Sequence, residues 1–251
     1  MKKRFIKIIG VLFFALLAIG IIFFGYQESN KKELQQRADF AEAAVPSEAN
    51  KLKKITTKVQ ALYSDKAQNF LNNKTSTESV EALKVEVQAI KATPQAYGIT
   101  EKVALPRLQT LADNKQKIQE QLEQIATKLT IQENLSPLFL SPITEWEEVT
   151  DEVIAASVTS QKIEEITTTL ETLPDSQWHK NISAYLSQAK EQFDQVKAIK
   201  QTLSDYLSKE NPIKYEDYAT LLENINSISN EELRNDLSNQ LDQVENELGI
   251  A

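Results

Sequence analysis

The sequence predicts an all-α protein, with an N-terminal transmembrane helix followed by an elongated bundle of tandem helical-hairpin or three-helix units. Residues 8–26 contain no charged side chain, and apolar residues beyond them recur at helical spacing between proline-marked breaks. Of the five glycines, only Gly98 and Gly249 lie beyond residue 26. Tight hairpins and phosphate-binding loops need glycine at positive φ, so neither is expected here.

The uncharged segment is predicted to be a membrane anchor. As a helix its nineteen residues would rise about 28 Å, close to the roughly 30 Å hydrocarbon core of a bilayer. Thirteen of them are Ile, Leu, Phe or Val. The residues that we place in the membrane include Ile8, Leu12, Phe13, Leu16, Ile19, Phe23 and Tyr26.

Basic residues before the anchor predict its orientation. They are Lys2, Lys3, Arg4 and Lys7. By the positive-inside rule, residues 1–7 form a cytoplasmic head and the C-terminal domain is extracellular. A cleaved signal peptide is the alternative, but its apolar region is shorter, about 7–15 residues, and ends in a small-x-small cleavage site. No such site directly follows Tyr26, so we expect a single-pass membrane protein.

Composition narrows the partners of the exported part. Residues 1–26 hold four of the 28 Lys and Arg and none of the 36 Asp and Glu, which leaves a net charge of −12 beyond them. Such a domain should not bind nucleic acid through bulk charge. The chain has no cysteine, which excludes a lipoprotein, disulfides and thiol chemistry. A large exported domain without disulfides is typical of a bacterial envelope, Gram-positive in our interpretation.

The remaining chain is divided by its prolines and polar breaks. We expect a stalk over residues 27–45 that ends at Pro46, a helical module over 46–134 and a second over 135–251. The expected helices cover about 47–72, 76–93, 101–132, 143–156, 160–173, 176–208, 213–228 and 230–249, with capping boxes at 75–78 and 229–232. Heptad seams at 108–129 and 182–206 could pack within one chain or between chains, so the oligomeric state stays open.

An internal repeat is indicated by one apolar spacing that occurs three times. The matching sets are Val80/Leu83/Val87/Ile90, Ile163/Ile166/Leu170/Leu173 and Tyr218/Leu221/Ile225/Ile228. Any amphipathic helix can show this spacing, which is the simpler interpretation. A true repeat would describe helical units joined through shared long helices.

The first of these sets belongs to a segment with a family resemblance. Residues 59–90 contain Leu62-Tyr63-Ser64-Asp65 at a helix end, a short break and a segment from Thr75 to Leu83 that begins the next helix. This arrangement resembles the extracellular helical repeat of the mid-cell-anchored, division-site-positioning (MapZ) family. The resemblance implies one membrane pass, helical extracellular modules, and a link to cell division and the cell wall.

Catalytic and metal chemistry find little support in the residue inventory. His179 is the one histidine, and thiols are absent, which disfavours zinc and other transition metals. No Gly-x-Ser-x-Gly motif suggests a serine hydrolase. We expect no enzyme activity and no cofactor, and we assign His179 to a helix start.

An acidic cluster surrounds Trp146. It contains Glu145, Glu147, Glu148, Asp151 and Glu152. A solvated acidic face is the simplest interpretation. Calcium binding and a glycosidase carboxylate pair are the alternatives, although the EF-hand spacing and its glycine are missing.

Aromatic residues near predicted breaks are the candidates for partner contact. They are Tyr97, Trp146 and Trp178, because aromatic faces stack on sugar rings or anchor protein interfaces. The sequence therefore predicts a membrane-anchored extracellular scaffold or binding protein that contacts wall glycan or an envelope or division protein. A regulatory, sensor or inhibitor subunit of an envelope enzyme or transporter is the alternative.

Overall fold

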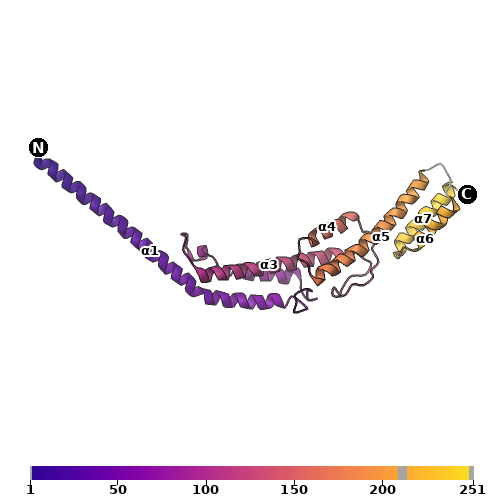
Figure 1. Ribbon diagram of the computed structural model, residues 1–251, viewed down its shortest axis with the longest axis horizontal. Coiled ribbons are helices and arrows are strands. Elements are labelled where there is room, and N and C mark those ends of the chain that lie inside the picture. The colour runs from indigo at the N-terminus through magenta and orange to yellow at the C-terminus, as the bar shows by residue number, and fades with distance from the viewer. Residues whose placement is uncertain (1, 209–213, 249–251) are drawn as a thin grey trace. The chain divides into compact units, whose positions relative to one another are not determined.

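The computed structural model describes the backbone of residues 2–208 and 214–248 and the side chains of residues 30–208 and 214–246. Over these ranges the chain forms a helical bundle with seven α-helices and no strand, which confirms the predicted all-α class (Figure 1). The helices are α1 (Lys2–Gln60), α2 (Thr77–Gln88), α3 (Pro106–Leu135), α4 (Ser160–Leu170), α5 (Gln177–Leu207), α6 (Tyr215–Asn226) and α7 (Glu231–Leu248).

Among the residues with described side chains, no helix has the length and apolar character needed to cross a membrane. The predicted anchor at residues 8–26 and the basic head at 1–7 lie outside those residues. Both therefore stay predictions from the sequence.

Helix α1 runs through Pro46, which corrects the prediction that this proline ends a stalk. A proline inside a helix removes one backbone hydrogen bond and favours a kink, and α1 is bent rather than straight (Figure 1). The helix continues because one heptad face is buried on both sides of the proline. The buried members are Ala38, Ala41, Val45, Glu48, Leu52, Ile55 and Val59. Residues 38–45 therefore belong to the packed bundle.

Packing divides the chain into two compact units. The first packing unit comprises residues 1–59 and 81–121, and the second comprises residues 60–80 and 122–251. This division differs from the predicted junction at residue 135, because α3 contributes its N-terminal part to one core and its C-terminal part to the other. A long helix with one continuous seam can serve two cores in succession.

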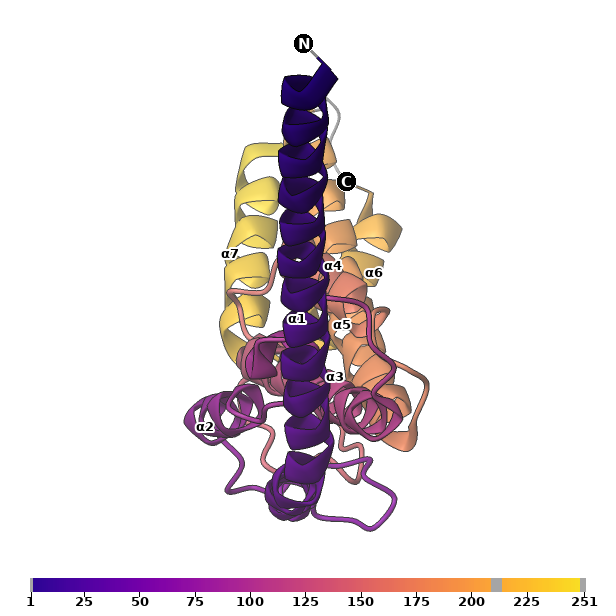
Figure 2. The same ribbon diagram turned by 90° about the vertical axis from the view of Figure 1, so that its left-hand side faces the viewer.

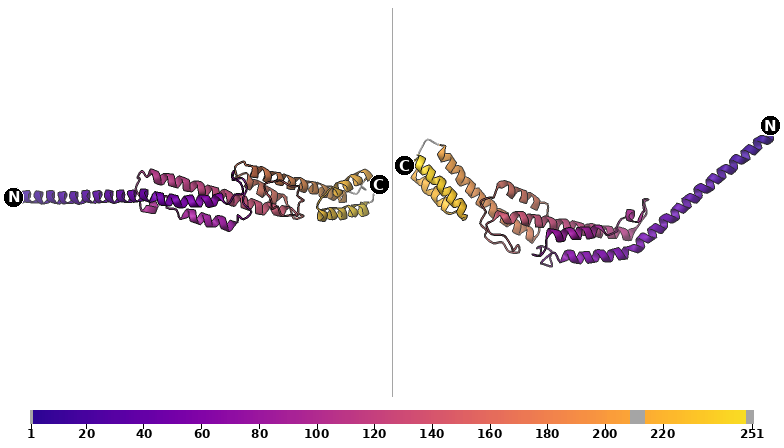
Figure 3. Two further views of the ribbon diagram at one scale, coloured as in Figure 1. Left: turned by 90° about the horizontal axis from the view of Figure 1, so that it is seen from below. Right: turned by 180° about the vertical axis from the view of Figure 1, so that it is seen from behind.

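The second packing unit is built around α5. This helix packs against α4, α6 and α7, and α6 packs against α7. Figure 2 shows α5, α6 and α7 side by side, and Figure 3 shows the α6–α7 pair in two further views. The largest fully buried side chains of α5 are Trp178, Ile182, Tyr185 and Leu203.

The segment between α3 and α4 is extended, which corrects the predicted acidic helix over 143–156. Phe139 and Ile154 pair as an isolated antiparallel bridge, and the flanking backbone hydrogen bonds measure 2.8 Å. β-Branched residues favour this conformation at Ile143, Thr144, Val149, Thr150, Val153 and Ile154. The acidic residues and the helical spacing of this segment therefore did not indicate its extended conformation.

Side chains of α5 satisfy the backbone of the extended segment. Asn181 donates to Trp146 O and Glu147 O, Tyr185 to Glu148 O, Gln188 to Thr150 O and Gln192 to Glu152 O, at 2.6–3.1 Å. In return, the backbone N–H groups of Thr150, Glu152 and Ile154 donate to Tyr185, Gln188 and Gln192 at 3.2 Å. Because unpaired backbone groups are costly to bury, this ladder replaces the hydrogen bonds of a helix.

Equivalent backbone hydrogen bonds recur along the chain. After α1, Asn72 N donates to Leu62 O and Thr75 N to Asn72 O; after α3, Ala155 N donates to Leu138 O and Val158 N to Ala155 O. A hydroxyl oxygen then caps each following helix: Ser76 Oγ accepts from Ser79 N, and Thr159 Oγ1 accepts from Lys162 N. The turns after α2, α4 and α6 close with bonds from Ile90 N to Val87 O, Leu173 N to Leu170 O and Ile228 N to Ile225 O.

The side-chain ladder makes a direct prediction for Gln192. The Gln192→Leu variant leaves Glu152 O and Ile154 N without their partner and should lower the free energy of unfolding by about 1–3 kcal/mol. Urea unfolding of the purified protein, followed by circular dichroism, measures the loss. Gln161→Leu is the control, because Gln161 is exposed and bonds only Glu165 on its own helix. Equal stability of both variants would contradict the role of the ladder.

Candidate functional site

The connection between α2 and α3 is the longest link that follows a short helix. This Tyr97 loop covers residues 89–105, whereas the links from α4 to α5 and from α6 to α7 cover only 171–176 and 227–230. Pro94 starts a 3₁₀ turn that ends at Tyr97, followed by Gly98. The loop lies in the first packing unit together with residues 30–59 of α1.

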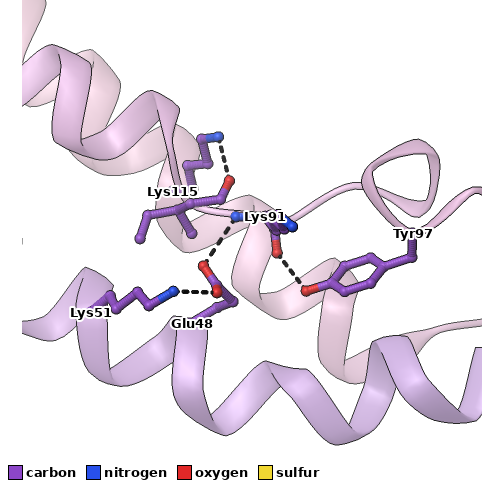
Figure 4. Close-up of polar contacts among 6 residues, drawn as sticks. Glu48, Lys51, Lys91, Tyr97 and Lys115 are labelled. Atoms are coloured by element: carbon purple, nitrogen blue, oxygen red, sulfur yellow. Dashed lines mark hydrogen bonds and ion pairs between the residues drawn. The ribbon is translucent and has the colours of Figure 1, made fainter.

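Glu48 joins α1 to the start of the loop. It is only 7% exposed, on the buried face of α1. Its Oε1 accepts a hydrogen bond from Lys51 Nζ at 2.7 Å, and its Oε2 accepts one from Lys91 N at 3.1 Å (Figure 4). Burial raises the pKa of the Glu48 carboxyl, but these hydrogen bonds and the two lysine charges outweigh it and hold the pKa below its ordinary value.

Lys115 of α3 binds the C-terminal end of α2. Its Nζ donates to Gln88 O at 3.0 Å and to Ile90 O at 2.7 Å, carbonyls that have no partner within the helix. Figure 4 shows Lys115 and Glu48 on either side of this chain segment. Burial lowers the pKa of Lys115, and the Glu48 charge opposes that shift. Both charged groups are thus engaged with backbone atoms.

Tyr97 rests on α1 and forms an aromatic pair with Phe40. The two ring centroids lie 6.1 Å apart at an interplanar angle of 70°, an edge-to-face contact. The Tyr97 hydroxyl donates to Lys91 O at 3.1 Å (Figure 4). Burial and the charge of Glu48 raise the pKa of this hydroxyl, with Lys51 opposing them. Tyr97 is half-buried, whereas Phe40 is 68% exposed.

Arg37 fastens the tip of the loop to α1. Its Nη1 donates to Gly98 O at 2.6 Å, while Nη2 pairs with Glu33 at 2.6 Å. Gly98 adopts a left-handed conformation, with φ of 70°. A Cβ atom at this position would lie 3.0 Å from Arg37 Nη1, so the close approach also favours glycine.

A cleft of about 490 Å³ lies between the Tyr97 loop and the start of α3. Its walls are mostly apolar, and they comprise Ala92, Thr93, Pro94, Gln95, Val103, Ala104, Leu105, Pro106, Leu108, Gln109 and Ala112. The loop and α1 therefore offer an aromatic pair with exposed Phe40, and the loop borders an apolar cleft in the same packing unit. This chemistry suits binding, because Arg37, Glu48 and Lys115 beside the loop are engaged in structural hydrogen bonds.

The structure separates the three predicted aromatic contacts. Tyr97 lies at the candidate site. Trp146 is half-buried and packs edge-to-face on Tyr185, with centroids 6.1 Å apart. Trp178 is fully buried in the second packing unit, so its side chain is not available for the predicted partner contact. Its position at a helix start did not indicate burial, because the core that covers it comes from distant segments.

The acidic cluster and His179 belong to the second packing unit, whereas the Tyr97 loop belongs to the first. The cluster residues lie within the extended segment between α3 and α4. There, Glu147 accepts a hydrogen bond from Ser64 at 2.8 Å. In the part of the chain that the structure describes, no group of three or more His, Cys, Asp and Glu could hold a metal ion. His179 lies in the first turn of α5, where its backbone N–H donates to Ser176.

Lys128 is a buried cation that the sequence did not reveal. It is 8% exposed, and its Nζ donates to Asn69 O at 2.6 Å. The ring centroids of Trp178 and Tyr63 lie 5.0 and 5.6 Å from this nitrogen. Burial lowers the pKa of Lys128 to about 8, and the charge of Asp65 opposes the shift. The amine is thus held by a carbonyl and two rings within the core.

Comparisons with models of protein families, with curated proteins and with solved structures found no match to this chain. The geometry of its own residues therefore carries the functional argument.

The Glu48→Gln variant should be less stable than the unchanged protein at pH 7, by about 1–3 kcal/mol, because the charge-assisted bonds to Lys51 and Lys91 weaken. The pKa of Glu48 is lower in the folded state, so its contribution is present above the ordinary value of 4.5 and is lost as the pH falls through the folded pKa. Urea unfolding at pH 7 and pH 4 measures both effects. Glu120→Gln, at an exposed position of α3, is the control and should leave the free energy of unfolding unchanged at both pH values.

The stability of the Lys128→Met variant relative to the unchanged protein should fall as the pH rises above 7, because the variant lacks the buried amine. The folded protein holds the Lys128 pKa at about 8, below the ordinary 10.5, so the unfolded chain binds the proton more tightly and stability rises with pH in this window. The free energy of unfolding of the variant, relative to that of the unchanged protein, should therefore fall by about 2 kcal/mol between pH 7 and pH 10. Lys117→Met, at an exposed position of α3, serves as control in the same unfolding titrations. A pH-independent difference would contradict the buried cation.

Proposed function

We propose that this chain is a non-enzymatic, single-pass protein of the bacterial cell envelope whose extracellular helices bind a partner near the cell wall. Residues 8–26 anchor it, residues 1–7 remain in the cytoplasm, and the helices beyond them form the binding part. The observation that most directly supports a binding role is the aromatic pair formed by exposed Phe40 of α1 and half-buried Tyr97 of the Tyr97 loop.

The equivalent hydrogen bonds support tandem helical repeats, each with a short helix followed by a long helix. Repeat 1 covers residues 61–135, repeat 2 covers 136–207 and repeat 3 covers 208–248. The loops of repeats 1 and 2 each contain an equivalent backbone bridge and an equivalent helix cap. All three short helices end in the same kind of turn. Each long helix leads into the next repeat, as the apolar spacing suggested.

The Tyr97 loop supports binding because it departs from this repeated plan. Repeats 2 and 3 join their short and long helices through a few residues, so packing does not require a long link. The additional residues in repeat 1 are held in place by Arg37, Glu48 and Lys115. An ordered loop with an exposed aromatic pair is typical of a binding surface on a rigid scaffold.

The ionisable groups favour a scaffold or binding protein over an enzyme. Among the described groups with perturbed pKa values, Glu48, Lys115 and Lys128 each form hydrogen bonds with backbone atoms. These bonds account for their burial without a substrate. A partner protein or a wall glycan fits the exposed aromatic surface better than a small reacting substrate does.

The segment that resembles division-site-positioning proteins lies at residues 59–90, and the loop-and-cap pattern within it recurs at 138–162. We therefore propose a partner that acts in division or wall growth. A fluorescent fusion should be enriched at the division site or along the envelope. Release of the fusion into the medium would contradict the anchor, and a diffuse cytoplasmic signal would contradict export.

Photo-crosslinking tests the binding surface. A photoreactive phenylalanine derivative at position 40 should capture a discrete envelope protein or wall fragment, because Phe40 is exposed beside Tyr97. The same residue at position 85 is the matched control, since Val85 of α2 is 66% exposed in the same packing unit. Capture at position 40 but not at 85 supports the proposal, and an envelope enzyme or transporter as the partner would favour a regulatory subunit. Identical adducts at both positions would contradict a specific surface.

A further inference from the structure

An apolar groove of about 310 Å³ lies in the second packing unit, between the end of the extended segment, α5 and α7. Its apolar lining comprises Ile154, Ala155, Ala156, Val158, Phe193, Val196 and Leu233. Its polar lining comprises Lys197, Lys200 and Gln201, all from α5. A volume of this size is at the lower end of small-molecule sites in proteins.

The buried positions of α7 repeat those of α5 at an interval of 55 residues. The pairs are Trp178 and Leu233, Ile182 and Leu237, Leu186 and Leu241, and Ala189 and Val244. The turns before the two helices keep the same interval, between Leu173 and Ile228. Leu233 therefore stands where the preceding repeat has a fully buried tryptophan. A leucine fills less space than an indole, and the groove opens beside it.

The lysines of the groove are also particular to this repeat. Lys128 and Gln192 donate to Asn69 O and Glu152 O, which occupy equivalent places in their loops, so α3 and α5 correspond at an interval of 64 residues. By that register, Lys197 and Lys200 correspond to Glu133 near the end of α3 and to Ser136 directly after it. An acidic and a neutral residue are thus replaced by two cations at the position where the cavity appears.

We propose that this groove binds a small organic anion whose apolar body is about the size of an indole ring. The apolar body would rest on Phe193, Val196 and Leu233, and the acid would face Lys197 and Lys200. Lys200 Nζ pairs with Asp236 at 3.1 Å, so one lysine is already partly neutralised by α7. Lys197 has no ion pair within the described part of the chain, and its charge would meet the acid.

The charge of the chain makes this complementarity specific. The protein carries a net charge of −8, which repels organic anions from most of its surface. Two cations above an apolar floor are a local exception. This inference is independent of the Tyr97 loop, which lies in the first packing unit.

Fluorine NMR of 5-fluoroindole-3-acetate with the full-length protein tests the site. We expect saturable broadening of the fluorine signal by the unchanged protein. Leu233→Trp restores the side chain of the preceding repeat and should weaken binding at least tenfold. The double variant Lys197→Gln/Lys200→Gln keeps the cavity and should weaken binding several-fold. Lys180→Gln, at an exposed position of α5, is the control and should bind as the unchanged protein does.

Circular dichroism of each variant verifies that it is folded, and identical buffer and detergent remove any contribution from micelles. Absence of saturable binding to the unchanged protein would overturn the proposal. Equal binding by the folded Leu233→Trp variant would overturn it as well. If Leu233→Trp does not fold, the lysine double variant decides, and unchanged affinity there would contradict the role of the cations. Partner capture at Phe40 tests the proposed function separately.

Discussion

The fold depends on how its non-helical segments satisfy their backbone hydrogen bonds. The helices of this glycine-poor chain are joined by segments that, within the described residues, pair through turns and isolated bridges, and neighbouring long helices supply further partners. Asn181, Tyr185, Gln188 and Gln192 do this for residues 146–154, Lys128 for Asn69, and Lys115 with Glu48 for the end of α2. Because an unpaired buried backbone group costs about 1–3 kcal/mol, these side chains determine where each segment lies.

The same requirement explains the buried charges. Glu48 and Lys128 would be candidates for catalysis by burial and perturbed pKa alone. Each instead holds a backbone atom of a connecting segment, which is a sufficient reason for a charge on a buried helix face. The acidic cluster around Trp146 likewise lies in an extended segment whose position is fixed by the hydrogen bonds of its backbone. A functional surface is therefore better indicated by a feature that helix packing alone does not require.

Two places have such a feature. The Tyr97 loop is the longest of three equivalent connections between a short and a long helix, and its Tyr97 ring packs on Phe40 of α1. The groove at Leu233 opens where the preceding repeat has an indole, and it carries two lysines. Within the repeats that we propose, a residue that differs from its counterparts is not explained by the interactions common to all copies. Partner binding and anion binding are thus proposed at separate positions.

The sequence by itself determined the all-α class, most helix positions and the threefold apolar spacing, because helical periodicity and proline or polar breaks are local properties. It did not predict the passage of α1 through Pro46, the extended segment at 139–159 or the burial of Trp178. Each of these depends on residues distant in the chain: a core on both sides of the proline, the amide ladder of α5, and helices packed around the indole. At the candidate site Tyr97 was predictable from its loop, whereas Phe40, Arg37 and Glu48 were not, because only tertiary packing brings α1 against residues 91–98.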